Sequence, residues 1–248
     1  MFKATIQDVS FLKDIFDSVS SLITEATFRL SNEGIELTAM DAASVAMVIL
    51  KILPSAFIEY ECDKEEQMTI NIGNFVNVLK RAKANDKITL ELGESKLKIK
   101  MIGDFKRNFS IPLIDITQTQ NKAPELSFKC KVELVSNALK DGIKDASMVS
   151  DCVIFEAKPD SFTIKSFGDL SETALELTKD SPSLISIECN EEIKAKYSID
   201  YLEKMMKALK SNEKVTLKFS SDYPVRIDYA SVDRFQLSYI LAPRVDTE

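Results

Sequence analysis

Histidine is absent from this chain of 248 residues, and so is tryptophan. Without histidine, the Ser-His and Cys-His pairs of nucleophilic catalysis cannot form, and the commonest metal ligand is missing. Glycine is scarce, with six residues, and neither GxGxxG nor a GxxxxGKS or GxxxxGKT phosphate loop occurs. These absences argue against an enzyme, and we expect no cofactor and no metal site.

Cysteine is also sparse. The four cysteines, at positions 62, 130, 152 and 189, are far apart and form no CxxC pair. They predict free thiols in a reducing compartment rather than a zinc site. No apolar run approaches the length of a membrane span, and the opening MFKATIQDVSF lacks the apolar core of a signal peptide. We therefore expect an intracellular protein without a membrane association.

The overall charge is acidic. The chain is 45% hydrophobic, which is enough for a substantial core, and its formal net charge is −7. An acidic protein does not bind nucleic acid through bulk charge, so a nucleic-acid role requires positive charge gathered on one surface.

The most informative feature is an internal repeat. LKRAKANDKITL at 79–90 recurs without a gap as MKALKSNEKVTL at 206–217, which is 127 positions later. The same offset relates several other positions: Leu12-Lys13-Asp14 with Leu139-Lys140-Asp141, Ser20 with Ser147, and Phe28 with Phe155. One constant offset over this length indicates duplication of a whole domain.

Each half alternates between two kinds of pattern. The 3.6-residue period predicts helices at 10–20, 74–84, 136–146 and 199–211. Period-two alternation predicts strands with one buried face, at 2–6, 27–31, 34–40, 45–52, 87–92, 96–102, 107–114, 128–134, 152–157, 161–167, 173–178, 214–220, 225–230 and 235–241.

These elements predict an α+β fold with two βαβββ-like units in each half. The polar segment TQTQNKAP separates the halves and ends in proline, as an extended connector does. We expect an N-terminal domain at 1–116, a connector at 117–124 and a C-terminal domain at 125–248.

Lysines recur with the repeat. Lys13 matches Lys140, Lys80 matches Lys207, and Lys83 matches Lys210. We expect all of them on helices, away from the apolar stripes. An ordinary solvated helix face explains any one of them, but recurrence in both halves favours a basic surface. Such a surface without clustered arginines fits sequence-independent contacts with phosphates.

Other charges differ between the halves. The second half holds an acidic pair, Asp141 and Asp145. The first half holds a basic triplet, Arg81, Lys83 and Arg107. This asymmetry fits a head-to-tail contact that closes into a ring. The alternative is that these charges are solvated or paired within the chain.

Four segments carry a resemblance to a known family: LKRAKANDKITL, the PLID at 112–115, LKDGIKDASMVSD at 139–151, and YILAPRV at 239–245. Together they resemble sliding clamps of the proliferating cell nuclear antigen (PCNA) type, in the archaeal form. The resemblance covers the whole chain. It implies a ring of three two-domain subunits, with helices lining the hole and antiparallel sheets outside.

The resemblance also implies functional residues. Those facing duplex DNA would be Lys13, Lys80, Lys140, Lys144, Lys204 and Lys207. The subunit joint would pair residues 107–116 with residues 172–179 of a neighbour, with Arg81, Lys83 and Arg107 meeting Asp141 and Asp145. A groove for a hydrophobic partner peptide would be lined by Met40, Val45, Met47, Pro224, Ile240, Leu241, Ala242 and Pro243. Asn121 and Ala123 replace larger apolar residues of relatives, so we expect the connector to contribute little.

The implied function is a processivity factor that encircles duplex DNA without reading its sequence. The implied partners are DNA polymerase, the clamp loader, flap endonuclease and DNA ligase, and the implied assembly is a homotrimer. We expect a cytoplasmic, nucleoid-associated protein if it is archaeal and a nuclear one if it is eukaryotic. The alternatives are one subunit of a heterotrimeric clamp and an oligomeric scaffold that does not bind DNA.

Overall fold

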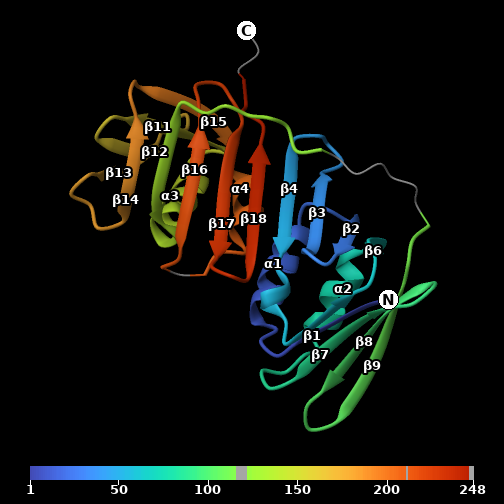
Figure 1. The fold of residues 1–248 in the computed structure, drawn as a ribbon. Helices are drawn as coiled ribbons and strands as arrows, with labels where there is room; N and C mark the ends of the chain where they lie inside the picture. The colour runs from blue at the N-terminus through green and yellow to red at the C-terminus, as the bar shows by residue number, and fades with distance from the viewer. Residues whose placement is uncertain (116–121, 211, 246–248) are drawn as a thin grey trace. The chain divides into compact units, whose positions relative to one another are not determined.

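The computed structural model describes residues 1–115, 122–210 and 212–245. The described chain is α+β, with two α-helices in each half (Figure 1). The first half contains β1 (Phe2–Ile6), α1 (Ser10–Ser20), β2 (Glu25–Ser31), β3 (Gly34–Met40), β4 (Ala46–Ile52), the 3-10 helix η1 (Pro54–Ala56), β5 (Glu59–Cys62), β6 (Glu66–Asn71), α2 (Ile72–Leu79), β7 (Lys87–Leu92), β8 (Lys96–Ile102) and β9 (Lys106–Pro112).

The second half repeats this order. It contains β10 (Cys130–Val135), α3 (Ser136–Ser147), β11 (Cys152–Lys158), β12 (Ser161–Phe167), β13 (Glu172–Thr178), β14 (Leu184–Cys189), β15 (Ile193–Ser198), α4 (Ile199–Met206), β16 (Lys214–Phe219), β17 (Val225–Ser231) and β18 (Phe235–Leu241). The duplication inferred from sequence therefore extends to every strand and α-helix.

Strand order is duplicated too. The orders β5-β1-β7-β8-β9 and β4-β3-β2-β6 in the first half match β14-β10-β16-β17-β18 and β13-β12-β11-β15 in the second. Every strand pair whose register is known is antiparallel, as in β8 and β9, where Lys98 stands opposite Ser110. The predicted fold class is confirmed. None of the described helices is long and apolar enough to cross a membrane.

The described residues cluster into two compact units, and each takes a short segment from the other half of the chain. The first unit comprises Met1–Ala42, Val48–Ala123 and Ala230–Leu237. The second comprises Ala43–Met47, Pro124–Tyr229 and Ser238–Glu248. The predicted boundaries at 116 and 124 contained no such exchange, and residues 117–121 of the predicted connector lie outside the described chain.

Specific contacts hold the segment 230–237 within the first unit. The Arg234 guanidinium bonds to Asp8 at 3.0 Å and lies 4.9 Å from the centre of the Phe11 ring. Phe11 stacks on Phe235 with ring centres 5.7 Å apart, and the Leu53 N–H donates to the Arg234 carbonyl at 2.9 Å. These contacts combine charge, stacking and backbone pairing.

A single core joins both sheets to the helix pair in each unit. In the first unit, the ring of Phe16 on α1 meets the ring of Phe75 on α2 edge-on, with 4.9 Å between the ring centres. The centre of the Phe28 ring on β2 lies 5.9 Å from that of Phe16. In the second unit, Phe219 of β16 lies about equally far, 6.1 Å, from Phe155 and Phe162 of the other sheet. Burying such a ring contributes roughly 1.5–3 kcal/mol, so these contacts fix the layers.

Two helices are shorter than predicted. The predicted helix 74–84 is Ile72–Leu79, and the predicted helix 199–211 is Ile199–Met206. The Asn71 side chain accepts the Asn74 N–H at 3.0 Å and caps the first of these helices. Beyond Leu79 the chain turns, because the Asp86 carboxylate accepts the Lys83 N–H at 2.7 Å. The apolar period continued past this turn, so the sequence interpretation made the helix too long.

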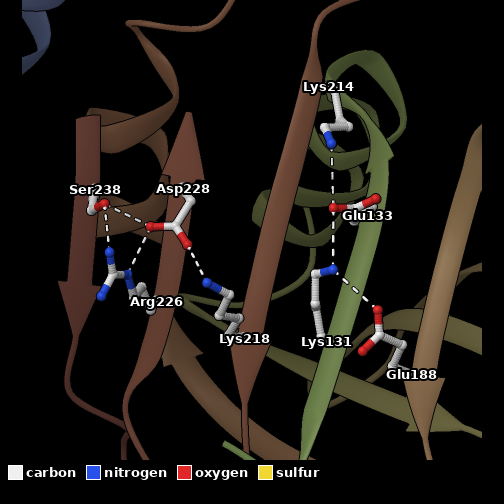
Figure 2. A network of polar contacts seen from close by, with 8 residues as sticks. All are labelled: Lys131, Glu133, Glu188, Lys214, Lys218, Arg226, Asp228 and Ser238. Carbon is white, nitrogen blue, oxygen red and sulfur yellow. Dashed lines mark hydrogen bonds and ion pairs between the residues drawn. The ribbon is translucent and has the colours of Figure 1, made fainter. Parts of the chain in front are cut away.

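In the second unit, the outward face of the sheet β14-β10-β16-β17-β18 carries a network of ion pairs (Figure 2). On β17, the Asp228 carboxylate accepts hydrogen bonds from Ser238 at 2.6 Å, Arg226 at 2.7 Å and Lys218 at 2.9 Å. On β10, Glu133 pairs with Lys131 and Lys214. Burial raises the pKa of Asp228, but the three hydrogen bonds outweigh it, so the pKa lies below its ordinary value.

The β2–β3 turn requires a residue without a side chain at Gly34. Its φ is +127°, and a Cβ placed there would collide with the backbone carbonyl of Ile52. We expect Gly34→Ala to lower the free energy of unfolding by about 1–3 kcal/mol in chemical denaturation. Gly73→Ala is the control, since its Cβ would meet only the Asn71 side chain at 3.3 Å. Equal stability of the two variants would contradict the requirement.

The Asp228 network predicts a pH dependence. Because the folded-state pKa is lowered, this carboxylate stabilises the fold above its ordinary pKa of 3.8, and the contribution is lost as the pH falls through the folded pKa. We expect Asp228→Asn to lower the free energy of unfolding by about 1–3 kcal/mol at neutral pH. The difference from wild type should shrink towards pH 3.8 and below. The exposed Glu203→Gln is the control, and a pH-independent difference would contradict the network's role.

Candidate nucleic-acid interface and partner groove

Two of the predicted DNA-facing lysines bind carbonyl oxygens within their own unit. Lys13 of α1 donates to the Ala82 carbonyl at 2.5 Å, and Lys140 of α3 donates to the Leu209 carbonyl at 2.6 Å. The pairs are related by the repeat. Each ammonium group satisfies a carbonyl in the turn beyond the second helix, where such groups lack helical partners. Lys13 and Lys140 thus join the two helices of each pair as well as carrying charge.

The remaining lysines near these helices have different surroundings. Lys80 follows the last residue of α2 and pairs with Asp17 of α1 at 2.6 Å. Lys204 pairs with Asp200 at 2.6 Å, one turn earlier in α4. Lys207 follows the end of α4 and is exposed. Lys80 and Lys207 were predicted inside helices, but they are the C-cap residues that directly follow α2 and α4.

One position reverses its charge between the halves. The counterpart of Asp17, 127 positions later, is Lys144, which is exposed on α3. The acid that neutralises Lys80 in the first half is therefore a lysine in the second. In the first helix pair, Asp17 offsets the positive charge of Lys80. In the second helix pair, Lys144 adds a positive charge at the same position.

The predicted subunit-interface cations are largely engaged within the first unit. Arg107 of β9 forms an ion pair with the buried Asp86 and donates to the Arg81 carbonyl at 2.8 Å. The backbone N–H of Lys83 is the main cause of the lowered pKa of Asp86, and Arg107 adds to it. Lys83 pairs with Asp104 at 3.1 Å. For Arg107 the structure therefore shows the intrachain pairing that the sequence analysis gave as the alternative.

The other interface candidates have exposed side chains. Arg81 lies in the turn after α2, and Asp141 and Asp145 lie on α3. No described residue forms an ion pair with any of the three side chains.

Most of the predicted peptide-groove residues lie in the second unit. There the Ala242 N–H donates to the Val45 carbonyl at 2.9 Å, which brings two distant segments together. The members differ in burial. The buried ones are Met47, Ile240 and Leu241, and the half-buried ones are Val45, Pro224, Ala242 and Pro243. Met40, 41% exposed, belongs to the first unit. Of the predicted connector contributors, Asn121 lies outside the described residues and Ala123 is exposed.

A hollow opens beside the C-terminal part of this group. Its volume is about 500 Å³, and its lining residues are Ile154, Lys194, Ala195, Lys196, Ser221, Asp222, Arg244 and Val245. The Arg244 N–H donates to the Lys196 carbonyl at 2.7 Å, and the Arg244 side chain bonds to Asp151 at 2.9 Å. These bonds hold the segment that follows Pro243 against β15, so the half-buried prolines and Ala242 present a fixed surface.

Sequence reasoning missed the acids that organise these surfaces. Asp86 and its counterpart Glu213 stand at the same place in the duplicated phrase, and each accepts the N–H of the lysine three residues earlier. The acid in both copies of the phrase was a signal that could have identified the turn. Asp17 carried no such signal, because its counterpart is a lysine. Among the described residues, no cluster of three or more cysteine, aspartate or glutamate side chains could hold a metal.

Comparisons with known proteins agree along the whole chain. Residues 1–120 match the N-terminal domain of proliferating cell nuclear antigen, and residues 122–244 match its C-terminal domain. The DNA polymerase sliding clamp of Thermococcus gammatolerans is 38% identical over 246 residues, covering 99% of each chain.

Solved structures give the same result. PCNA from Thermococcus kodakaraensis superposes with a TM-score of 0.94 at 30% identity, covering 98% of this chain and 100% of that one. The A. fulgidus PCNA bound to the C-terminal region of FEN-1 gives 0.91 at 28% identity, with complete coverage of both chains. Sequence, strand order and three-dimensional superposition all place this chain in the proliferating cell nuclear antigen family of sliding clamps.

Proposed function

We propose that three copies of this chain form a ring that encircles duplex DNA and holds replication enzymes on it. The observation that carries the proposal is the duplicated α+β unit with an open strand at each end. β9 ends the sheet β5-β1-β7-β8-β9, and β13 ends the sheet β13-β12-β11-β15. Among the described residues, each pairs on one side only, β9 with β8 and β13 with β12. An open edge on each of two strands is what a head-to-tail assembly needs.

The two open edges have complementary charge. β9 begins with Lys106 and Arg107, whereas β13 carries Glu172 and Glu176. Opposite charges on neighbouring strands stabilise pairing. Pro112 at the end of β9 fits an edge strand, and Ile116 of the predicted joint lies outside the described residues. Because one chain carries both edges, a homotrimer follows more simply than a heterotrimer.

The helix surfaces support the DNA contact. Lysines recur near the helices of both halves, and no described helix surface shows clustered arginines for reading bases. Contacts to phosphates alone are sequence-independent and weaken with salt, so the ring can slide. Retention on DNA then depends on encirclement rather than on affinity.

The C-terminal surface supports the recruitment of partner enzymes. Val45, Pro224, Ala242 and Pro243 give a half-buried apolar group, which suits a short hydrophobic peptide. A relative binds the C-terminal region of FEN-1, and other relatives are named for DNA polymerase. We extend these partners to this chain, together with the clamp loader and DNA ligase. The chain itself then has no catalytic step to perform.

Light scattering tests the ring. We expect a molar mass three times the 27.8 kDa of the chain. Glu172→Lys with Glu176→Lys gives β13 the same sign of charge as Lys106 on β9 and should shift the mass towards the monomer on dilution. Glu191→Lys with Glu192→Lys makes the same change in charge off these strands and should leave the mass unchanged. A wild-type monomer would contradict the homotrimer.

The helix lysines are tested by the salt dependence of DNA binding. Lys144→Gln should lower the slope of log binding constant against log salt by about one, because each lysine that neutralises a phosphate adds about that much to the slope. Lys80→Gln should change the slope less, because Asp17 already offsets that charge. Titration of duplex DNA at several salt concentrations measures both. Equal slopes for Lys144→Gln and wild type would remove Lys144 from the interface.

A further inference from the structure

The outward face of the first unit's five-stranded sheet carries a row of lysines on β8. Lys96, Lys98 and Lys100 alternate with the fully buried Leu97 and Ile99, so the three ammonium groups share one face. Along a strand, such alternate residues are about 6.8 Å apart.

The three lysines have no partner among the described residues. None forms an ion pair or a side-chain hydrogen bond there. Glu91 of β7 stands opposite both Lys98 and Lys3 but forms an ion pair with neither. The face is also hollowed. A depression of about 330 Å³ is lined by Glu91, Lys96, Lys98, Ile99, Lys100, Asn108, Phe109 and Ser110.

The equivalent face of the second unit differs in its charge balance. Lys98 opposes Glu91, and in the second unit Arg226 opposes Lys218 at the matching positions of β17 and β16. Two residues further along these strands, the first unit has Lys100. The second unit has Asp228 at that position, as Figure 2 shows. The second face thus neutralises its own cations through Asp228, whereas the first has a cation at that position.

We propose that the Lys96, Lys98 and Lys100 face binds an extended acidic segment of a partner protein. Carboxylates at every second residue of an extended peptide are also about 6.8 Å apart. At physiological salt, charges further than about 8 Å away are largely screened, so the chain's net negative charge does not prevent binding. Asn108 and Ser110 of β9 border the depression and offer hydrogen bonds to the same segment.

The face fits a short acidic segment better than a nucleic acid. Beyond β7 and β1, the sheet ends at β5, whose exposed Glu59 and Glu61 are acidic. A long polyanion lying across the strands would meet these carboxylates, whereas three carboxylates along β8 would lie beside Glu91 but away from Glu59 and Glu61. Exposed ion pairs are individually weak. The contact therefore adds affinity for a partner that is already bound elsewhere on the clamp.

The test uses a fluorescein-labelled peptide of alternating glutamate and serine with the whole protein. Fluorescence anisotropy at low salt should show binding that weakens as salt rises. Lys96→Gln/Lys98→Gln/Lys100→Gln should weaken it about tenfold, as expected when three exposed ion pairs are removed. DNA binding by this variant should be unchanged, which separates the acidic-segment site from the clamp function.

A control variant separates the site from bulk charge. Lys64→Gln/Lys122→Gln/Lys129→Gln removes three other exposed lysines and should leave peptide binding within about twofold of wild type. An equal loss in both variants, or no loss in the first, would overturn the proposal. Single-stranded oligothymidylate is the competing probe. If the β8 variant loses oligothymidylate binding but keeps peptide binding, the face belongs to nucleic acid and the proposal is wrong.

Discussion

The apolar core that two helices share with both sheets decides which surfaces of each unit are left to interact. Every strand that packs against the core has one buried face, and each helix has one buried stripe. Phe16, Phe75 and Phe28 show the arrangement in the first unit, and Phe155, Phe162 and Phe219 show it in the second. What remains outside is the far side of the helices and the outward side of the sheets. The proposed DNA contact uses the first surface, and the proposed acidic-segment site uses the second.

Charges that look free in the sequence partly serve the fold itself. Lys13 and Lys140 satisfy carbonyls beyond the second helix of their units, and Arg107 neutralises a buried Asp86. Removing one partner of such a pair leaves the other without compensation, which is costly when it is buried. A loss of DNA binding or of assembly in variants at these positions therefore includes a loss of folding stability.

Duplication followed by divergence explains the chemical differences between the units. The backbone pattern is the same in both, since each strand and α-helix has its counterpart. Single side chains have changed on surfaces that packing does not constrain. Asp17 of the first half corresponds to Lys144 of the second on the helix side, and Lys100 stands where Asp228 organises the second outward face. The two units therefore share the same core but differ in the charges on their surfaces.

From the sequence alone, apolar periodicity predicted the fold class, a constant offset predicted the duplication, and four segments carried the resemblance to the family. Strands such as Gly34–Met40 and Ser161–Phe167 follow directly from the alternation of apolar residues. Only the tertiary structure decided which segment of each half joins the other unit and which lysines already have partners. Those outcomes depend on residues far apart in the chain, such as Lys13 with Ala82 and Arg234 with Asp8. No local pattern encodes such a pair, since its energy exists only once folding brings the two groups together.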